Sequence, residues 1–275
     1  MSQHPTLAFI GAGNMARAII GGLVSNGYPA EKIRASAPTI NKLDDLKALG
    51  LFTTQDNVEA MHSADVVILA VKPQMFKAVL LQLAATAAQT KPLFISVAAG
   101  ITSSSINQWL GGNQAIVRCM PNTPALVKMG TNGLYANNSV TPEQRTQAEE
   151  ILSATGLTLW VEDEELLHAV TAVSGSGPAY YFLFMEAMIA AGEKQGLSRD
   201  MATQLTLQTA RGAAEMAIQS DVTPAVLRRR VSSPNGTTEQ AILSFQANKL
   251  ETLVEEAMQA CAARSVAIAK ELGDD

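Results

Sequence analysis

Residues 9–23 read FIGAGNMARAIIGGL, and this stretch decides the fold. It sets Gly11, Gly13 and Ala16 in the pattern G-x-G-x-x-A, directly after a short apolar run and at the start of a helical pattern. This is the context in which a glycine-rich turn binds a dinucleotide, with the phosphates at the helix N-terminus. Gly11 permits the tight turn, Gly13 lets the pyrophosphate approach the backbone, and Ala16 allows close packing of helix and sheet. The alternative is a turn that serves packing alone.

Short apolar runs alternate with helical patterns through the first part of the chain. The strands are expected at residues 6–10, 32–36, 64–71, 93–98, 115–120 and 157–161, and helices at 14–25, 43–49, 75–88 and 143–155. Apolar strands separated by amphipathic helices predict a parallel sheet covered on both faces. The fold class is therefore α/β, with an N-terminal Rossmann domain whose sheet is mostly parallel.

From about Asp163 onward every long segment has helical spacing. The helices are expected at residues 179–195, 199–220, 224–231, 238–248 and 250–272. We therefore predict a dinucleotide-binding domain over residues 1–163 and an all-α domain over residues 164–275. Residues 179–191 are apolar on nearly all sides, so other helices must enclose them. This favours a subunit interface in the second domain.

Composition excludes several classes of protein. With 47% hydrophobic residues and a net charge of −5, the 275-residue chain is neither disordered nor a typical nucleic-acid binder. The one basic run, Arg228–Arg230, fits a helix end. Two distant cysteines and three scattered histidines predict neither disulfides nor a metal site. The first residues lack a signal-peptide pattern and no apolar run could span a bilayer, so we expect a cytoplasmic protein without membrane partners.

The end of the second predicted strand bears on the choice of cofactor. An NAD-selective site usually places a carboxylate there, whereas this chain has none before Asp44. Ser36 and Thr39 could donate hydrogen bonds to a 2′-phosphate, and Arg34 or Lys42 could supply positive charge. We therefore expect NADP(H) to be preferred, with NAD(H) also possible.

Three further positions could contact the cofactor. Lys72 follows the third apolar strand, where it could meet a ribose or phosphate or simply face solvent. Asn57 heads a helix and could reach the adenosine end or only cap that helix. Residues 98–100 could offer backbone to a nicotinamide.

A second pair of turns could bind a carboxylate. Residues 232–240 form a turn that opens a helix, where Thr237 and Gln240 fit a capping box. A cap alone is one interpretation; free N–H groups beside hydroxyls also make an anion site. Residues 173–178 repeat this pattern, with glycines that admit a ligand and a proline suited to a helix start. No acid–base dyad is visible in the sequence, as expected where a cofactor carries the chemistry.

Six segments together resemble one family. GAGNMARAIIGGL, AVKP, SVAAG, RCMPNTPALV, AVSGSGPAYYF and SSPNGTT occur in the order and approximate spacing found in pyrroline-5-carboxylate reductases. The resemblance covers nearly the whole chain. It implies reduction of 1-pyrroline-5-carboxylate to L-proline, the last step of proline biosynthesis, by hydride transfer from NAD(P)H to a C=N bond.

The resemblance also implies roles for individual residues. The catalytic Thr238 hydroxyl would bind the ring nitrogen, while the N–H groups of Gly236 and Thr237 would hold the substrate carboxylate. Ser174, Ser176 and Ser233 would complete the substrate site. The implied cofactor contacts, together with the glycine turn of Gly11 and Gly13, are Asn14, Met15, Ser36, Asn57, Ala70, Val71, Lys72, Pro73 and Ala99.

The same resemblance implies an oligomeric assembly, and the chain differs from the family at one position of the substrate turn. The family implies a homodimer with interleaved helical domains, and some members form decamers. Asn235 stands where the family usually has glycine; because Asn tolerates positive φ, the turn is expected to survive.

Two other functions compete. A β-hydroxyacid dehydrogenase would carry a lysine early in the helix over residues 179–191, and none is present. A non-enzymatic NADP sensor would bind cofactor without imine turnover.

Overall fold

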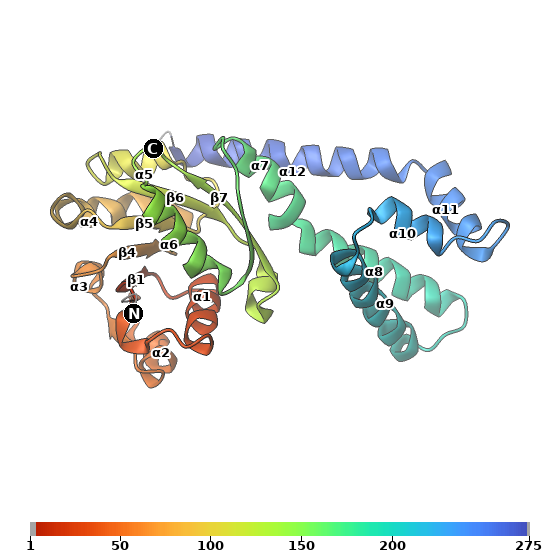
Figure 1. Cartoon of the computed structure of the whole chain (residues 1–275), viewed down its shortest axis with the longest axis horizontal. Coiled ribbons are helices and arrows are strands. Elements are labelled where there is room, and N and C mark those ends of the chain that lie inside the picture. Colours follow the sequence, from red (N-terminus) through yellow and green to blue (C-terminus); the bar gives the residue numbers. More distant parts are fainter. Residues whose placement is uncertain (1–3, 274–275) are drawn as a thin grey trace. The chain divides into compact units, whose positions relative to one another are not determined.

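One eight-stranded sheet organises the first part of the chain in the computed structural model, which describes residues 4–273 (Figure 1). The strand order is β3-β2-β1-β4-β5-β6-β7-β8; the first six are parallel, β7 runs antiparallel to β6, and β8 is parallel to β7. This confirms the mostly parallel Rossmann sheet. The strands are β1 (Leu7–Ile10), β2 (Ile33–Ser36), β3 (Phe52–Thr54), β4 (Val66–Leu69), β5 (Leu93–Ser96), β6 (Ala115–Met120), β7 (Gly130–Ala136) and β8 (Gly156–Trp160).

Helices cover both faces of this sheet because its strands are apolar on both sides. Alternate residues such as Leu7 and Phe9 pack with α1, α2 and α6, whereas Ala8 and Ile10 pack with α3, α4 and α5. The helices are α1 (Asn14–Ser25), α2 (Asp44–Ala48), α3 (Asn57–Met61), α4 (Phe76–Thr90), α5 (Ser103–Trp109) and α6 (Pro142–Ser153). The core is thus two apolar layers on either side of one sheet.

The carboxyl ends of the central strands lie at one edge of the sheet. Ile10 pairs in register with Ser36 on one side and Leu69 on the other, and Leu69 pairs with Ser96. The strand order reverses between β1 and β4, and ligands of open α/β sheets bind beside such a switch point. The turns after β1, β2, β4 and β5 therefore surround one candidate site.

Two strands and one helix were missing from the sequence prediction: β3, β7 and α5. The helix expected to begin at Asn57 is α3. Strand β7 reads GTNGLYA and lacks the expected apolar alternation. Its glycines admit close neighbours instead: a Cβ on Gly133 would lie 2.4 Å from Val170 Cγ1, and one on Gly156 of β8 would lie 2.0 Å from Gly130 O. The strand is stabilised by close packing at its glycines, which the pattern of apolar side chains in the sequence does not show.

The second part of the chain is helical, as predicted. It contains α7 (Leu166–Val170), a π-helical turn over Thr171–Gly175, α8 (Gly177–Lys194), α9 (Arg199–Gln219), α10 (Pro224–Arg230), α11 (Thr237–Ala247) and α12 (Leu250–Gly273). Packing divides the chain into one unit that extends to Ser176 and takes in α12 from Cys261 onward, and another over Gly177–Ala260. This division falls later than the predicted boundary at residue 163.

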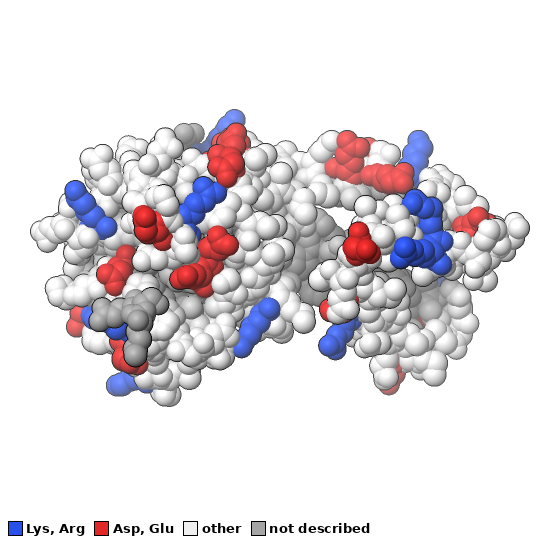
Figure 2. Space-filling view, viewed as in Figure 1, with Lys and Arg blue, Asp and Glu red and all other residues white. Residues whose placement is uncertain are grey.

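The surface of the second unit carries the chain's basic run at a helix end. Arg228, Arg229 and Arg230 form the last turn of α10, and basic side chains gather over this helix in Figure 2. Cations near a helix C-terminus are stabilised by the helix dipole. Among the described helices, none is long and apolar enough to cross a membrane.

Candidate functional site

Gly11 brings the first turn against the fourth strand. Its φ is +98°, and an added Cβ would lie 2.7 Å from the Ala70 carbonyl oxygen and 2.9 Å from Val71 N. The turn is fixed on both sides, since Gly11 N–H donates to Ser36 O at 3.0 Å and Ala70 N–H donates to Ile10 O at 2.9 Å. Gly11 is therefore required by the protein's own backbone.

Gly13 differs, because nothing in the protein requires it. Its φ of −77° suits any residue, and a Cβ there would meet no atom within 4 Å. The side chain's absence leaves open space in front of α1, whose N–H groups at Asn14 and Met15 precede the first helical hydrogen bond, Arg17 N to Gly13 O. The described chain places neither a side-chain cap nor an acidic residue on this first turn. The start of α1 thus fits a pyrophosphate.

Ser36 and Asn57 form one unit beside this turn. Ser36 is fully buried, and its hydroxyl donates to Asn57 Oδ1 at 2.7 Å. The cap of α3 is Asp56, whose carboxylate accepts from Val58 N and Glu59 N. The interpretation of Asn57 as a helix cap is therefore wrong. Because the Ser36 proton is committed to Asn57, the half-buried Asn57 amide presents the donor groups of the pair.

Of the two cations expected near a 2′-phosphate, the Arg34 side chain is used in hydrogen bonds within the described chain and the Lys42 side chain is not. Arg34 donates to the carbonyls of Glu59 and Ala60 at 2.7 and 2.9 Å and lies 4.1 Å over the Phe52 ring, so its guanidinium caps the end of α3. Lys42 is exposed, like Thr39, in the segment after β2. The arginine fork is thus used within the protein, whereas the Lys42 side chain is exposed to solvent.

The remaining predicted cofactor residues lie at the same edge. Ala70, Val71 and Pro73 are half-buried and Lys72 is exposed in the turn after β4, while Ala99 is exposed in the turn after β5. The structure thus brings the sequence-predicted cofactor residues together around the ends of β1, β2, β4 and β5. The described residues include no group of three or more His, Cys, Asp or Glu that could hold a metal ion.

The serine-rich segment forms the π-helical turn between α7 and α8. Ser174 Oγ donates to Val170 O at 3.0 Å, so its hydroxyl proton is used within the turn. Ser176 Oγ instead accepts from the Cys261 thiol at 3.3 Å, which leaves its own proton available. Single π-helical turns inside helices occur frequently at functional sites. Of the two predicted substrate serines in this turn, Ser176 is the better donor.

The SSPNGTT segment opens α11 and belongs to the second unit. Asn235 adopts φ +57°, which confirms that this residue accommodates the turn. The capping-box prediction is wrong: Gly236 is the N-cap, no side chain caps the helix, and Thr237 is its first residue. The Gly236 N–H donates to Ser233 O at 3.0 Å, so it is not free for a carboxylate.

What remains at this helix start still suits an anion. Thr237 and Thr238 are exposed, and their N–H groups precede the first helical hydrogen bond, Gln240 N to Gly236 O. Ser233 is exposed in the same turn, while the nearby Glu239 carboxylate accepts from Asn235 N at 2.7 Å. The turn therefore offers two N–H groups and a threonine hydroxyl.

Comparison with known proteins identifies the family. A family model described as pyrroline-5-carboxylate reductase dimerisation matches residues 164–268, and one described as NADP oxidoreductase, coenzyme F420-dependent, matches residues 6–100. The pyrroline-5-carboxylate reductase of Pseudomonas aeruginosa is 55% identical over 270 residues, covering 98% of each chain. The chain belongs to the pyrroline-5-carboxylate reductase family.

Solved structures of this family share the whole fold. The pyrroline-5-carboxylate reductase of Coxiella burnetii matches with a TM-score of 0.95 and 44% identity, covering 98% of this chain and 100% of its own. The Plasmodium falciparum reductase, solved with NADP bound, matches with a TM-score of 0.85 and 30% identity over 97% and 99% of the two chains. The two competing functions, a β-hydroxyacid dehydrogenase and a non-enzymatic sensor, are thereby set aside.

Family membership confirms the expected enzyme class. The protein is an NADP(H)-using oxidoreductase of proline biosynthesis that reduces 1-pyrroline-5-carboxylate to proline. It takes a small-molecule substrate and has a dimerisation domain.

Proposed function

We propose that the turns at the sheet edge hold NADP(H) and that the start of α11 holds the carboxylate of 1-pyrroline-5-carboxylate. The open space in front of Gly13 supports the first assignment, because it lies at the start of α1 beside N–H groups that precede the first helical hydrogen bond. The pyrophosphate would contact Gly11, Gly13, Asn14 and Met15, and the adenosine end Ser36 with Asn57. The turn of Ala70, Val71, Lys72 and Pro73 would meet the ribose side, and Ala99 the nicotinamide.

On this proposal the substrate is bound by backbone and hydroxyl groups. Thr237 and Thr238 would donate their N–H groups to the carboxylate, since the helix start favours an anion without needing a cation. Gly236 and Ser233 would shape the turn, and Ser174 and Ser176 are further proposed substrate residues. The Thr238 hydroxyl would donate to the ring nitrogen and serve as the catalytic group.

The chemistry asks little of the protein beyond orientation. When bound, the reduced cofactor supplies the hydride that adds to the imine carbon. A protonated cyclic imine is already electrophilic, so the side chains need only hold the ring face against the cofactor and keep a hydrogen bond on nitrogen. The free, exposed hydroxyl at Thr238 is the observation that carries this assignment.

Assembly as a homodimer with interleaved helical domains is part of the proposal. Tyr181 and Leu183 of α8 are 69% and 67% exposed in the single chain, and Phe182 and Phe184 are also exposed. So large an apolar surface on one helix indicates an interface. Light scattering should give a dimer or, with further assembly, a decamer; a monomer at micromolar concentration contradicts the proposal.

Boundaries and location complete the assignment. We place the functional boundary at residue 163, so that residues 1–163 bind the cofactor and residues 164–275 bind substrate and dimerise; the start of the matching dimerisation model at residue 164 supports this. A cytoplasmic location accords with two free cysteines that form no disulfide in the described chain.

The proposal is tested by NADPH oxidation with and without 1-pyrroline-5-carboxylate, for the wild type and Thr238→Ala. Loss of a transition-state hydrogen bond should lower kcat by about 100-fold and leave NADPH affinity nearly unchanged. The matched control is Thr146→Ala, which removes an exposed helical hydroxyl bonded to Pro142 O. Equal activity of the two variants would show that Thr238 is only part of the turn.

A further inference from the structure

The end of strand β6 carries two buried polar side chains that core packing does not explain. The strand reads AIVRCM, and its Arg118 is 6% exposed; Asn122, two residues after it ends, is 8% exposed. Burying a charge is costly unless it is paired and hydrogen-bonded. Their partners therefore indicate why these residues are here.

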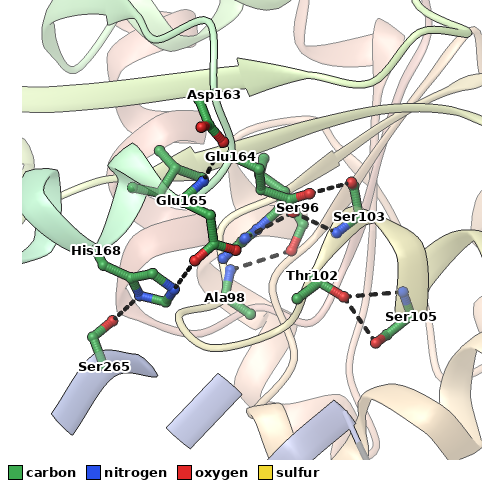
Figure 3. Close-up of polar contacts among 12 residues, drawn as sticks. Ser96, Ala98, Thr102, Ser103, Ser105, Asp163, Glu164, Glu165, His168 and Ser265 are labelled. Carbon is green, nitrogen blue, oxygen red and sulfur yellow. Dashed lines mark hydrogen bonds and ion pairs between the residues drawn. The ribbon is translucent and has the colours of Figure 1, made fainter. Parts of the chain in front are cut away.

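Arg118 connects to the turn after β5 through Glu164, which lies beside Ser103 in Figure 3. Its Nη1 donates to Glu164 Oε1 at 2.8 Å, and the same carboxylate accepts from Ser103 N at 2.6 Å and Ser103 Oγ at 2.7 Å. Ser103 begins α5 directly after the turn that carries Ala99. At the other end of that turn, Ser96 pairs in register with Arg118 through the backbone of the two strands. The ion pair thus fixes the Ser103 end of the proposed nicotinamide turn, and the pairing of β5 with β6 fixes the Ser96 end.

The other face of this turn is held by the end of α12. A Cβ on Gly100 would lie 2.6 Å from Ile268 Cγ2, and Ser265 Oγ bonds His168 Nδ1 at 2.8 Å. Figure 3 shows His168, Ser265 and Glu164 around the same turn. The turn is therefore confined on two sides, so its position depends on these contacts as well as on its own sequence.

Asn122 connects β6 to the serine turn. Its Oδ1 accepts from Thr131 N at 2.8 Å and its Nδ2 donates to Ser174 O at 3.0 Å. The turn lies directly on the strand end, because a Cβ on Gly175 would be 2.4 Å from Met120 Cε. One amide side chain thus fixes the serine turn to the sheet.

We infer that the end of β6 sets the cofactor turn and the serine turn in register with each other: Arg118 and Glu164 position the turn that carries Ala99, and Asn122 positions the turn that carries Ser176. This rests on the proposed function, which assigns nicotinamide to the first turn and substrate to the second. All these residues are positioning residues. Hydride transfer needs the reacting atoms about 3–3.5 Å apart, and a misplacement of about 1 Å costs roughly 100-fold in rate.

The test separates the two turns by their ligands. Glu164→Gln keeps the side chain's shape but removes the charge opposite Arg118; NADPH affinity, measured by fluorescence titration of the purified protein, should fall about 10-fold, with little change in KM for 1-pyrroline-5-carboxylate. Asn122→Ala should raise that KM and lower kcat up to about 100-fold, with unchanged NADPH affinity. The matched control is Glu162→Gln. Glu162 lies two residues before Glu164, and this change removes its exposed ion pair with Arg145.

Two results would overturn the inference. One is that Glu164→Gln or Asn122→Ala lowers only the melting temperature, while NADPH affinity and KM for 1-pyrroline-5-carboxylate match those of Glu162→Gln. The other is that each variant weakens the binding of NADPH and of the imine equally. If either variant fails to fold, Ser103→Ala and Asn122→Asp remove single hydrogen bonds from the same two connections and must show the same split. Because NADPH titration needs no turnover, failure here is distinguishable from a wild type that does not reduce the imine.

Discussion

The two glycines of the first turn should respond in opposite ways to the same substitution. Gly11→Ala forces a Cβ within 2.7 Å of Ala70 O, against backbone that cannot move aside, at φ +98°. Positive φ costs a non-glycine residue about 1–2 kcal/mol, and overpacking adds about 1–3 kcal/mol. The free energy of unfolding should therefore fall by about 2–5 kcal/mol, which lowers Tm by roughly 5–15 °C in a chain of this size.

Gly13→Ala should instead leave the ligand-free fold almost intact. Its Cβ would meet nothing within 4 Å and its φ is ordinary, so the cost is a less favourable N-cap, about 0.5–1 kcal/mol. The methyl group would occupy the space assigned to the pyrophosphate, so NADPH affinity should fall at least about 10-fold.

Thermal melts of the ligand-free variants, with NADPH titration by fluorescence, measure both effects. Gly21→Ala on α1 is the matched control, since its Cβ also meets nothing within 4 Å but lies inside the helix. A Gly13→Ala protein that binds NADPH as tightly as this control would refute the reasoning. A Gly11→Ala protein with the same Tm as the wild type would also refute it.

Three further predictions concern the cofactor pair, the substrate turn and a buried thiol. Asn57→Asp keeps the acceptor for Ser36 but sets a carboxylate beside the 2′-phosphate, so NADPH should weaken about 10-fold and NADH far less; equal losses contradict the specificity argument. Asn235→Ala, at φ +57°, should cost about 1 kcal/mol and raise KM for the imine, whereas Asn235→Gly should not. Burial raises the pKa of the Cys119 thiol well above its ordinary 9.0. Above pH 9 the thiol therefore ionises only in the unfolded chain, and the free energy of unfolding measured with urea should fall by up to about 1.4 kcal/mol per pH unit. In Cys119→Ala this fall with pH should be less steep. Identical slopes for the two proteins would show that Cys119 ionises in the folded state.

Local patterns were enough for much of the fold. Helix α1 begins at Asn14 and ends at Ser25 as predicted, and β6 spans its predicted residues, because the apolar period and the glycine turn are properties of short stretches. The cofactor edge could likewise be predicted from residues that follow apolar strands, since parallel strands end at one edge.

Side-chain partners could not be predicted in the same way. Ser36 donates to Asn57, Arg34 turns to the end of α3, and Gly236 N–H is used within its own turn. Each outcome depends on which groups the fold brings within about 3 Å, and sequence spacing does not fix that distance.

The sequence by itself determined the class of fold, the glycine turn, the absence of a carboxylate after β2 and the family. Only the tertiary structure decided that β7 joins the sheet through glycines packed against their neighbours, and that Arg118, Asn122 and Glu164 connect two turns far apart in the chain. The physical reason is range: periodicity and turn chemistry act over a few residues, whereas burial, close packing and ion pairing depend on neighbours that only the folded chain supplies.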